Sequence, residues 1–379
     1  MNEYKMSEQQ VQTGRNIQAE DKLFGNVLHV APNDKYWKCG IIAVVTSYRR
    51  NIPDFEYHPS TGAKHKLLNA ITFPFVIVHY MITLARKNHL KIIHIHGSAR
   101  GSFVRKYIFF LIAKYLYGKK VVLHMHAADF HTFYDRSFPL LKKLIYHYIT
   151  HVDCVIVLSA SWKQYFSETF PTGKFIIIPN IVEAVSSPAS SQVPKNGSLL
   201  SFLFLGEIGQ RKGIFDLLKV IAEHQDTFRN KCCFKIGGNG EVERLQSMID
   251  EYHIGDIVQF LGFVSGDKKI SLLKNSDIYI LPSYNEGLPI SILEAMAHSM
   301  PIISTTVGGI PEIVKDGENG ILISPGDYDA IAKAIHFFLD QPSFIPLYGQ
   351  ASYNRVAGKH FPAQVLGLLD QVYRTVLNE

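Results

Sequence analysis

The chain has 379 residues, of which 47% are hydrophobic and 19% are charged, a composition typical of soluble globular proteins. Because one hydrophobic core rarely holds so long a chain, we expect two domains of roughly 150 to 200 residues each. The apolar runs are interpreted as shorter than the roughly 18 to 20 residues that span a bilayer, so an integral membrane protein is not expected. The four cysteines show no CxxC spacing, which argues against a disulfide framework and against a zinc site.

The net charge of +6 is distributed unevenly. Residues 1–185 hold 23 Lys/Arg against 12 Asp/Glu, a balance of +11, whereas residues 186–379 hold 16 against 21, a balance of −5. A basic half favours an anionic partner, either a membrane surface or an anionic substrate. Nucleic acid is not expected as a partner, because basic and aromatic residues are not interleaved as they are in known binding modules.

The predicted elements begin after a polar segment, residues 1–22, which has no apolar signal core and is expected to be a flexible tail of a cytoplasmic protein. Short β-branched runs then alternate with helix-length segments, which is typical of βαβ units on a parallel sheet. Residues 23–185 are predicted to form one such domain. Its expected strands are residues 26–31, 43–48, 91–97, 119–126, 154–159 and 174–180.

A Ser- and Pro-rich stretch without periodicity, residues 186–198, is predicted to be a linker. Residues 199–345 then form a second Rossmann-like domain, and the helices expected in residues 346–379 are predicted to pack back on the first domain. Its expected strands are residues 201–206, 231–238, 257–262, 277–283, 301–309 and 319–324. Two doubly wound α/β domains leave a cleft at the carboxyl ends of their strands, where we expect the ligand site.

One stretch of the second domain, SYNEGLPISILEAMAHSMP (283–301), joins a strand end to a helix. Pro289 suits the first turn of that helix, where a missing N–H costs nothing. The neighbouring backbone N–H groups have no intrahelical partners, and we expect them to point into the cleft beside the positive end of the helix dipole. They belong to Gly287, Leu288 and Ile290. The segment therefore predicts a site for an anion or a polyol.

Two glutamates flank these donors. Glu286 can accept hydrogen bonds from ligand hydroxyls, and Glu294, about two turns along the helix, is expected to face the cleft. For either residue an ordinary interpretation remains open: Glu286 can complement the helix dipole, and Glu294 can face solvent.

A second loop, GEIGQRKG (206–213), places Arg211 and Lys212 beside a helix N-terminus. A cation and a helix dipole together can hold phosphate, although the spacing is not that of a Walker loop. A solvated pair of cations in a turn is the alternative. Two more glycine-rich turns, residues 237–241 with Gly238 and residues 307–314, are expected at the same sheet edge.

Taken together, these residues resemble the retaining, nucleotide-sugar-dependent glycosyltransferases of the glycogen-synthase-like group 1 family, which have the GT-B fold of two Rossmann-like domains. The resemblance covers roughly residues 201–325, and it rests on two glutamates eight residues apart around Gly-Leu-Pro and on the EAMAHSMPIISTTVGGIPEIV that begins at the second glutamate. It implies that Glu294 binds the ribose hydroxyls, that Glu286 binds the hydroxyls of the donor sugar, and that Lys212 neutralises the diphosphate.

The sequence departs from this family at several positions. Glu207 stands where an arginine usually follows the first glycine of the phosphate loop, and Arg211 is the candidate to replace that arginine. Cys39 stands where a glycine is expected, which weakens the expectation of a close backbone approach there. His126 matches a histidine that lies close to the transferred sugar, although Ala127 replaces the usual glycine.

The acceptor side is expected in the first domain. Either Arg100, Arg105 and Lys106 grip an anionic acceptor, or they belong to an ordinary helix start. Residues 102–120 and 139–149 mix large apolar residues with cations, which favours contact with anionic membrane headgroups. The alternative is a pair of helices that cover the sheet while their lysines extend outward.

No metal or other cofactor is expected, because capping at a helix start explains Asp327 and Asp329 better than Mg²⁺ binding. The expected function is transfer of a hexosyl group, with UDP-sugar favoured over GDP-sugar as donor. The expected acceptor is a hydroxyl of a glycan or a polyprenyl-linked sugar in surface polysaccharide biosynthesis, in the cytoplasm or at the inner face of the cell membrane. A nucleotide-sugar epimerase of the same fold and a non-catalytic nucleotide-sugar-binding protein are the alternatives.

Overall fold

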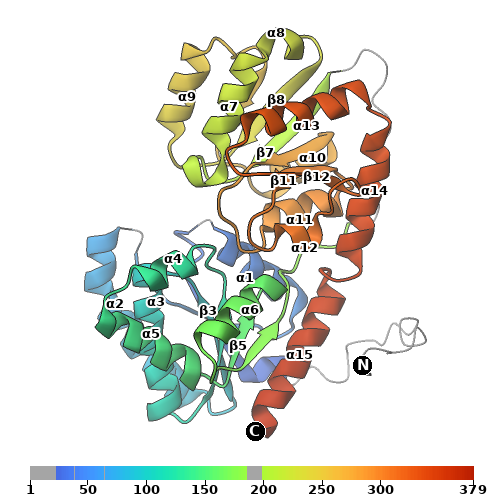
Figure 1. Ribbon diagram of the computed structural model, residues 1–379. Coiled ribbons are helices and arrows are strands. Elements are labelled where there is room, and N and C mark those ends of the chain that lie inside the picture. The colour runs from blue at the N-terminus through green and yellow to red at the C-terminus, as the bar shows by residue number, and fades with distance from the viewer. Residues whose placement is uncertain (1–22, 38, 64, 186–198) are drawn as a thin grey trace, which may run out of the picture.

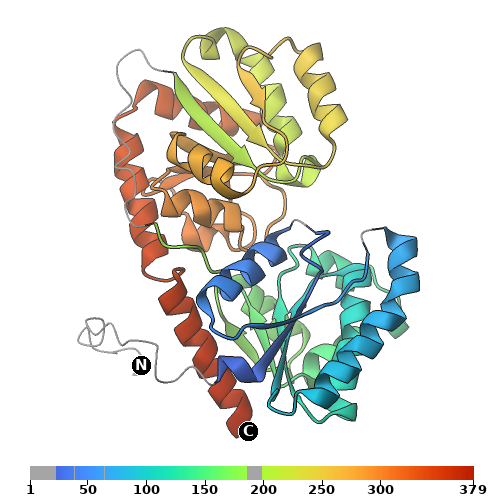
Figure 2. The same cartoon turned by 180° about the vertical axis from the view of Figure 1, so that it is seen from behind.

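The computed structural model describes residues 23–37, 39–63, 65–185 and 199–379 (Figure 1). The predicted tail, residues 1–22, and the predicted linker, residues 186–198, lie outside the described residues. The described chain forms two α/β halves, each with a parallel sheet between helices (Figure 2). The predicted architecture of two doubly wound domains is confirmed.

The N-terminal half is built on six parallel strands in the spatial order β2-β1-β3-β4-β5-β6. They are β1 (Val27–Ala31), β2 (Glu56–Pro59), β3 (Ile92–Gly97), β4 (Lys120–Met125), β5 (Cys154–Val157) and β6 (Phe175–Ile177). Most of them read as continuous apolar runs, because helices cover both faces of a parallel sheet. Five of the six strands predicted for this half are confirmed, at slightly narrower bounds.

The predicted strand at residues 43–48 is wrong, because these residues lie within α1 (Gly40–Asn51). Val44 and Tyr48 are buried four residues apart, on one side of that helix. A short β-branched run does not by itself distinguish a strand from a buried helix. The sixth strand is β2 at the sheet edge, whose sequence EYHP carries no apolar signal.

Helices cover both faces of this sheet (Figures 1 and 2). On one face α1 packs beside α15 (Pro362–Asn378), which comes from the end of the chain. The other face is covered by α2 (Lys66–Arg86), α3 (Arg100–Leu111), the π-helical η4 (Ile112–Leu116), α4 (Phe130–Asp135), α5 (Pro139–His151) and α6 (Ala160–Thr169). A short 3-10 helix, η3 (Phe24–Asn26), precedes β1.

One of these helices contradicts an expectation from the sequence. Leu67–Arg86 of α2 is long and apolar enough, by length and composition, to cross a membrane, and only 17% of that window is buried within the protein. Polar but uncharged residues such as Asn69 and His79 interrupt the apolar run. A search for uninterrupted apolar runs therefore underestimates the length of this apolar helix.

The C-terminal half has six parallel strands in the order β12-β11-β10-β7-β8-β9. All six predicted strands are confirmed, as β7 (Leu200–Leu205), β8 (Cys232–Gly237), β9 (Val258–Phe260), β10 (Ile278–Leu281), β11 (Ile302–Thr305) and β12 (Gly320–Ile323). Around them lie η5 (Gln210–Lys212), α7 (Ile214–Glu223), α8 (Gln225–Phe228), α9 (Val242–Glu251), α10 (Gly266–Lys274), α11 (Ile290–Ala297), α12 (Ile310–Ile313), α13 (Tyr328–Asp340) and α14 (Phe344–Ala357).

The last two helices divide between the halves. α14 packs against α11, and its Ile345 and Tyr348 belong to the C-terminal core. α15 runs along the N-terminal half (Figure 1), where Leu369 and Tyr373 are buried. Of the segment 346–379, which was expected to pack back on the first domain, α15 does so and α14 does not. The reason is that the apolar residues of α14 complete the core around α11.

A row of histidines crosses the sheet face covered by α1 and α15. Side chains alternate between faces along a strand, and the register pairs His29 with His94 and His96 with His124. Ring nitrogens are 3.2 Å apart between His29 and His96 and between His94 and His124, and 3.1 Å apart between His96 and His126. His124 is fully buried.

Burial keeps this histidine row uncharged. It lowers the pKa of His29 and of His124 from 6.5 to about 3, and for His29 the neighbouring His124 adds to the effect. It also lowers the pKa of His94, His96 and His126 well below 6.5. Neutral imidazoles can donate and accept hydrogen bonds along a row, whereas charged rings would repel one another.

The free energy of unfolding should therefore fall as the pH decreases from about 6.5 toward 3. In this window the unfolded chain protonates these histidines and the folded chain does not, so the unfolded state binds more protons. Each such histidine contributes about 1.4 kcal/mol per pH unit. Urea unfolding between about pH 7 and pH 5 measures the slope.

The variant His124→Leu should reduce this slope by the contribution of one histidine, about 1.4 kcal/mol per pH unit. The variant His89→Leu, at an exposed histidine, should leave the slope unchanged. An unchanged slope in His124→Leu would show that the row is not the source of the acid sensitivity.

Candidate functional site

Two loops of the C-terminal half meet at the carboxyl ends of neighbouring strands. β7 and β10 are adjacent in the sheet. The loop after β7 leads into η5, which carries Arg211 and Lys212. The loop after β10 carries Glu286 to the start of α11, where Pro289 is the N-cap residue and Ile290 the first helical residue. The structure thus brings the two predicted loops together at the sheet edge where ligands of such folds bind.

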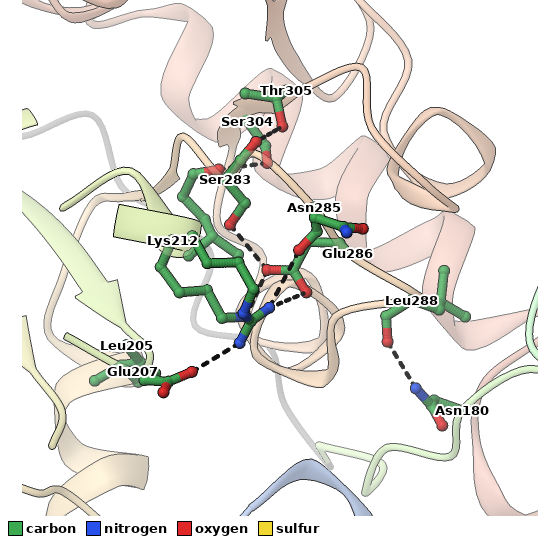
Figure 3. Close-up of polar contacts among 12 residues, drawn as sticks. Asn180, Leu205, Glu207, Lys212, Ser283, Asn285, Glu286, Leu288, Ser304 and Thr305 are labelled. Atoms are coloured by element: carbon green, nitrogen blue, oxygen red, sulfur yellow. Dashed lines mark hydrogen bonds and ion pairs between the residues drawn. The ribbon is translucent and has the colours of Figure 1, made fainter. Parts of the chain in front are cut away.

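Lys212 and Glu286 form a buried ion pair at this meeting point (Figure 3). Lys212 Nζ lies 2.5 Å from Glu286 Oε1, and the Ser283 hydroxyl donates a hydrogen bond to the same oxygen at 2.8 Å. The two charged side chains are only 13% and 5% exposed. Because an unpaired buried charge is strongly unfavourable, each of them fixes the position of the other.

Arg211 lies at the rim of this pair. Its guanidinium donates a hydrogen bond to the Asn285 carbonyl at 3.1 Å and lies 3.9 Å from Glu286 Oε2. It also donates to the Glu207 carboxylate at 2.9 Å. Glu207 is one of the departures from the family pattern, and here it neutralises part of the positive charge that Arg211 brings to the loop.

A third loop, after β11, packs against the backbone of Glu286 and Gly287. Gly308 has a positive φ of 56°, and a Cβ at this position would lie 1.9 Å from the Glu286 carbonyl oxygen. The next residue, Gly309, donates its backbone N–H to the Gly287 carbonyl at 2.7 Å. Only glycine allows this close approach, so the 307–314 turn positions the loop that carries Glu286 and Gly287.

Gly238 has a comparable packing role. A Cβ on Gly238 would lie 1.9 Å from the Gly206 carbonyl oxygen, at the beginning of the loop that holds Arg211 and Lys212. Gly238 therefore lets the loops after β7 and β8 touch. Contact of Gly238 with a ligand remains a prediction.

Glu294 lies on α11 and pairs with a residue that the sequence did not single out. Its Oε1 lies 2.5 Å from Lys269 Nζ on α10, and both side chains are partly buried. Lys268 is adjacent in the sequence, so the sequence alone does not tell which lysine faces α11. The structure assigns that position to Lys269.

His126 stands on the opposite wall, directly after β4. Its carbonyl oxygen lies 3.8 Å from the position that a Cβ on Gly287 would take. A small apolar pocket at this contact is lined by Ala127, Leu158 and Gly287, among others. Because the pKa of His126 is lowered by burial and by the nearby His124, its imidazole is neutral around pH 7.

Two helix N-termini also face each other across the halves. A Cβ on Gly40, the first residue of α1, would lie 3.7 Å from Ile290 Cδ1, at the first residue of α11. Cys39, the N-cap of α1, is exposed beside this contact. Helix N-termini carry partial positive charge, so the start of α1 and the start of α11 bring two such ends close together.

Contacts near these loops hold the halves together. Asn180 donates a hydrogen bond to the Leu288 carbonyl at 2.6 Å (Figure 3). The Glu312 carboxylate accepts hydrogen bonds from the backbone N–H groups of Ala160 and Ser161 at 2.9 and 3.0 Å. The sequence gives no signal for these pairs, because their partners are more than a hundred residues apart.

The three cations of α3, Arg100, Arg105 and Lys106, do not form one exposed cluster. Arg100 pairs with Asp129 at 2.9 Å and is exposed. Lys106 is fully buried, its Nζ has no hydrogen-bond partner among the described residues, and burial lowers its pKa to about 7. Lys106 is therefore not an exposed cation, and its charge adds to the lowering of the His126 pKa by burial.

The Asp327 carboxylate accepts a hydrogen bond from the Ala330 backbone N–H at 2.9 Å, so it caps α13 as the sequence predicts. Two groups of three histidines have ring nitrogens within 4.8 Å of one another, close enough to share a metal ion. They are His29, His94 and His96, and His96, His124 and His126. That the protein needs no metal stays a prediction.

Two models of glycosyltransferase families match different parts of the chain. The family described as Glycosyl transferases group 1 matches residues 188–355, and the Glycosyltransferase Family 4 matches residues 42–185. An uncharacterised glycosyltransferase of Methanocaldococcus jannaschii is 28% identical over 264 residues, which are 65% of this chain and 66% of that protein. The chain thus spans just under two thirds of that relative's length.

Solved structures show the same architecture. Sucrose-phosphate synthase from Thermosynechococcus elongatus superposes with a TM-score of 0.76 at 18% identity, over 93% of this chain and 99% of that one. Anabaena HepE, solved in complex with UDP-glucose, superposes with a TM-score of 0.72 at 15% identity, over 93% and 99% of the two chains. Both likenesses establish the fold.

The geometry of the Gly308 loop predicts a large difference between two glycine substitutions. Gly308→Ala should lower the free energy of unfolding by about 3 kcal/mol or more, because the new Cβ overlaps the Glu286 carbonyl in addition to the strained φ. Gly317→Ala is the matched control, since its φ of 74° is also positive but no atom lies within 4 Å of the new Cβ. It should cost only about 1 kcal/mol. Urea unfolding measures both, and equal losses would contradict the packing role of Gly308.

Proposed function

Because the chain belongs to the group 1 glycosyltransferase family, we propose that it transfers a hexosyl group from a nucleoside diphosphate sugar to an acceptor hydroxyl. The observation that carries the proposal is the Lys212–Glu286 pair at the meeting of two strand ends. It places a cation suited to a diphosphate directly beside a carboxylate suited to sugar hydroxyls. A nucleotide-sugar epimerase, the alternative, would need an acid and a base around the sugar ring.

The departing nucleoside diphosphate is the group that most needs stabilisation, because negative charge develops on it as the glycosidic bond breaks. Lys212 supplies a positive charge, and Arg211 adds a second one that Glu207 partly balances. An ammonium group has three donors, so Lys212 can hold Glu286 and a phosphate oxygen together. The backbone N–H groups of Gly287, Leu288 and Ile290 complete the anion site.

Glu286 is proposed to orient the donor sugar. Its carboxylate already accepts hydrogen bonds from Lys212 and Ser283, which holds it in one position and makes it a poor nucleophile. We therefore expect retention of configuration without a covalent intermediate on the protein, in contrast to retaining glycosidases. In this scheme the leaving phosphate deprotonates the acceptor hydroxyl on the same face of the sugar.

Glu294 is proposed to bind the ribose hydroxyls, with Lys269 orienting its carboxylate. UDP is favoured over GDP, and the complex of Anabaena HepE with UDP-glucose supports that choice by likeness of fold alone. The neutral His126 would donate or accept a hydrogen bond to the transferred sugar. No metal or further cofactor takes part in this proposal.

The acceptor is proposed to be a glycan or a polyprenyl-linked sugar in surface polysaccharide biosynthesis. The excess of basic residues in the N-terminal half supports work at the cytoplasmic face of an anionic membrane. The acceptor would then reach the cleft from this half, opposite the donor loops.

The donor assignment is tested by thermal unfolding with UDP, GDP and their sugars, because a ligand bound only to the folded state raises the melting temperature. Glu294→Ala should weaken nucleotide binding about 10- to 100-fold, the worth of charge-assisted hydrogen bonds. Glu286→Gln should leave nucleotide binding largely intact and reduce turnover. It should also lower the melting temperature without ligand, since it leaves Lys212 unbalanced.

Glu243→Ala, at an exposed residue of α9, is the control and should match the parent. The site assignment fails if the Glu294 and Glu286 variants both behave like the parent. Incubation of the donor without acceptor distinguishes the alternative, because an epimerase would change the sugar unaided.

A further inference from the structure

The outer side of α2 is an apolar surface with no partner among the described residues. Its exposed residues recur every three to four positions, which places them on one side of the helix. They are Leu67, Leu68, Ile71, Phe75, Val78 and Ile82, each between 43% and 80% exposed. At about 1.5 Å per residue this stripe is about 22 Å long. So long an exposed apolar stripe on a soluble domain indicates an interaction surface.

The inner side of the same helix is bound to the N-terminal core. Tyr80 and Leu84 are fully buried, and the Tyr80 hydroxyl donates a hydrogen bond to the Phe109 carbonyl of α3 at 3.4 Å. The Tyr117 hydroxyl donates to the Met81 carbonyl at 3.0 Å. A helix held in this way cannot be surrounded by lipid. It can present only its outer side, at the edge of the N-terminal half opposite α15 (Figures 1 and 2).

Three helical segments of this face carry charges of one sign, whereas α4 and α6 on the same face contain Asp135 and Glu168. Residues 66–86, 100–116 and 139–151, which make up α2, α3 with η4, and α5, contain eight Lys or Arg and no Asp or Glu. These helices lie on one face of the sheet, and η4 and α5 add further exposed apolar residues. They are Tyr115, Leu116 and Leu140. Exposed apolar side chains on helices with an excess of cations complement a bilayer with anionic headgroups.

We infer that the outer side of α2 inserts into the headgroup region of an anionic lipid bilayer, with the helix parallel to the membrane plane. Leu67, Ile71 and Phe75 enter the acyl boundary, and exposed cations of the same helices, Arg86, Arg100 and Lys143, contact lipid phosphates. This inference deepens the membrane contact included in the proposed function and names its surface. It does not depend on which donor the cleft binds.

Sedimentation of the full chain with vesicles tests the inference. The protein should bind phosphatidylcholine vesicles that contain about one third phosphatidylglycerol, and should bind pure phosphatidylcholine more weakly. The triple variant Leu67→Ser, Ile71→Ser, Phe75→Ser should lose about tenfold or more of this affinity. These side chains are exposed, so the fold should persist, which a thermal unfolding curve checks.

A matched control carries Phe263→Ser, Ile270→Ser and Leu347→Ser, which are exposed apolar positions of the C-terminal half. It should bind vesicles like the parent. Equal binding by the parent and the α2 variant, or no binding by the parent, would overturn the inference. So would a dimer that the α2 variant abolishes without any affinity for vesicles, since the surface would then serve a second copy of the chain.

Insertion is distinguished from charge attraction by Phe75→Trp. Its fluorescence, above the background of Trp37 and Trp162, should be quenched by lipids brominated on their acyl chains, and an absence of quenching would overturn the insertion step. Thermal unfolding with UDP in the absence of vesicles separates the two proposals. The α2 variant should keep the UDP shift, and a parent that binds vesicles but shows no shift would contradict the donor proposal alone.

Discussion

The buried pair of Lys212 and Glu286 constrains both the fold and the site. Charges so far from solvent are tolerated only with their partners and hydrogen bonds in place, so the loops that carry them must be held at a fixed separation. Adjacent strands β7 and β10 set that separation, and Gly308 lets a third loop close against Glu286. The contact that stabilises this sheet edge is thus the same contact that places a cation beside a carboxylate at the carboxyl ends of two adjacent strands.

The N-terminal half forms the other wall by different means. Its histidine row is neutral because it is buried, and it ends at His126, opposite Gly287. The start of α1 adds backbone N–H groups rather than a charged side chain. Fixed charges therefore come mainly from one wall of the cleft, while the other contributes neutral donors and acceptors. Such a division suits a site that must hold an anionic donor firmly and release an altered acceptor.

Much of this could be predicted from the sequence, because parallel strands buried on both faces leave long β-branched runs and because their carboxyl ends share one edge. From this rule, the loops that carry Lys212 and Glu286 were expected at the same edge of the sheet. It could not supply Lys269 as the partner of Glu294, since the facing lysine depends on how α10 packs. Nor could it show that Lys106 is buried, because a cation in an amphipathic helix usually points outward. In these cases tertiary packing overrides the local pattern.

The division of the last two helices limits how the molecule can move. The described chain passes between the halves near Asn180 and Val182 and again between α14 and α15, and the two crossings touch: the His360 carbonyl accepts a hydrogen bond from the Val182 N–H at 2.9 Å, and the His360 ring lies 3.0 Å from the Asn180 carbonyl oxygen. A movement of one half relative to the other would therefore have to bend the chain at this hydrogen-bonded pair of crossings. Residues 358–361, which follow α14, form one of these crossings, far along the chain from Lys212 and Glu286.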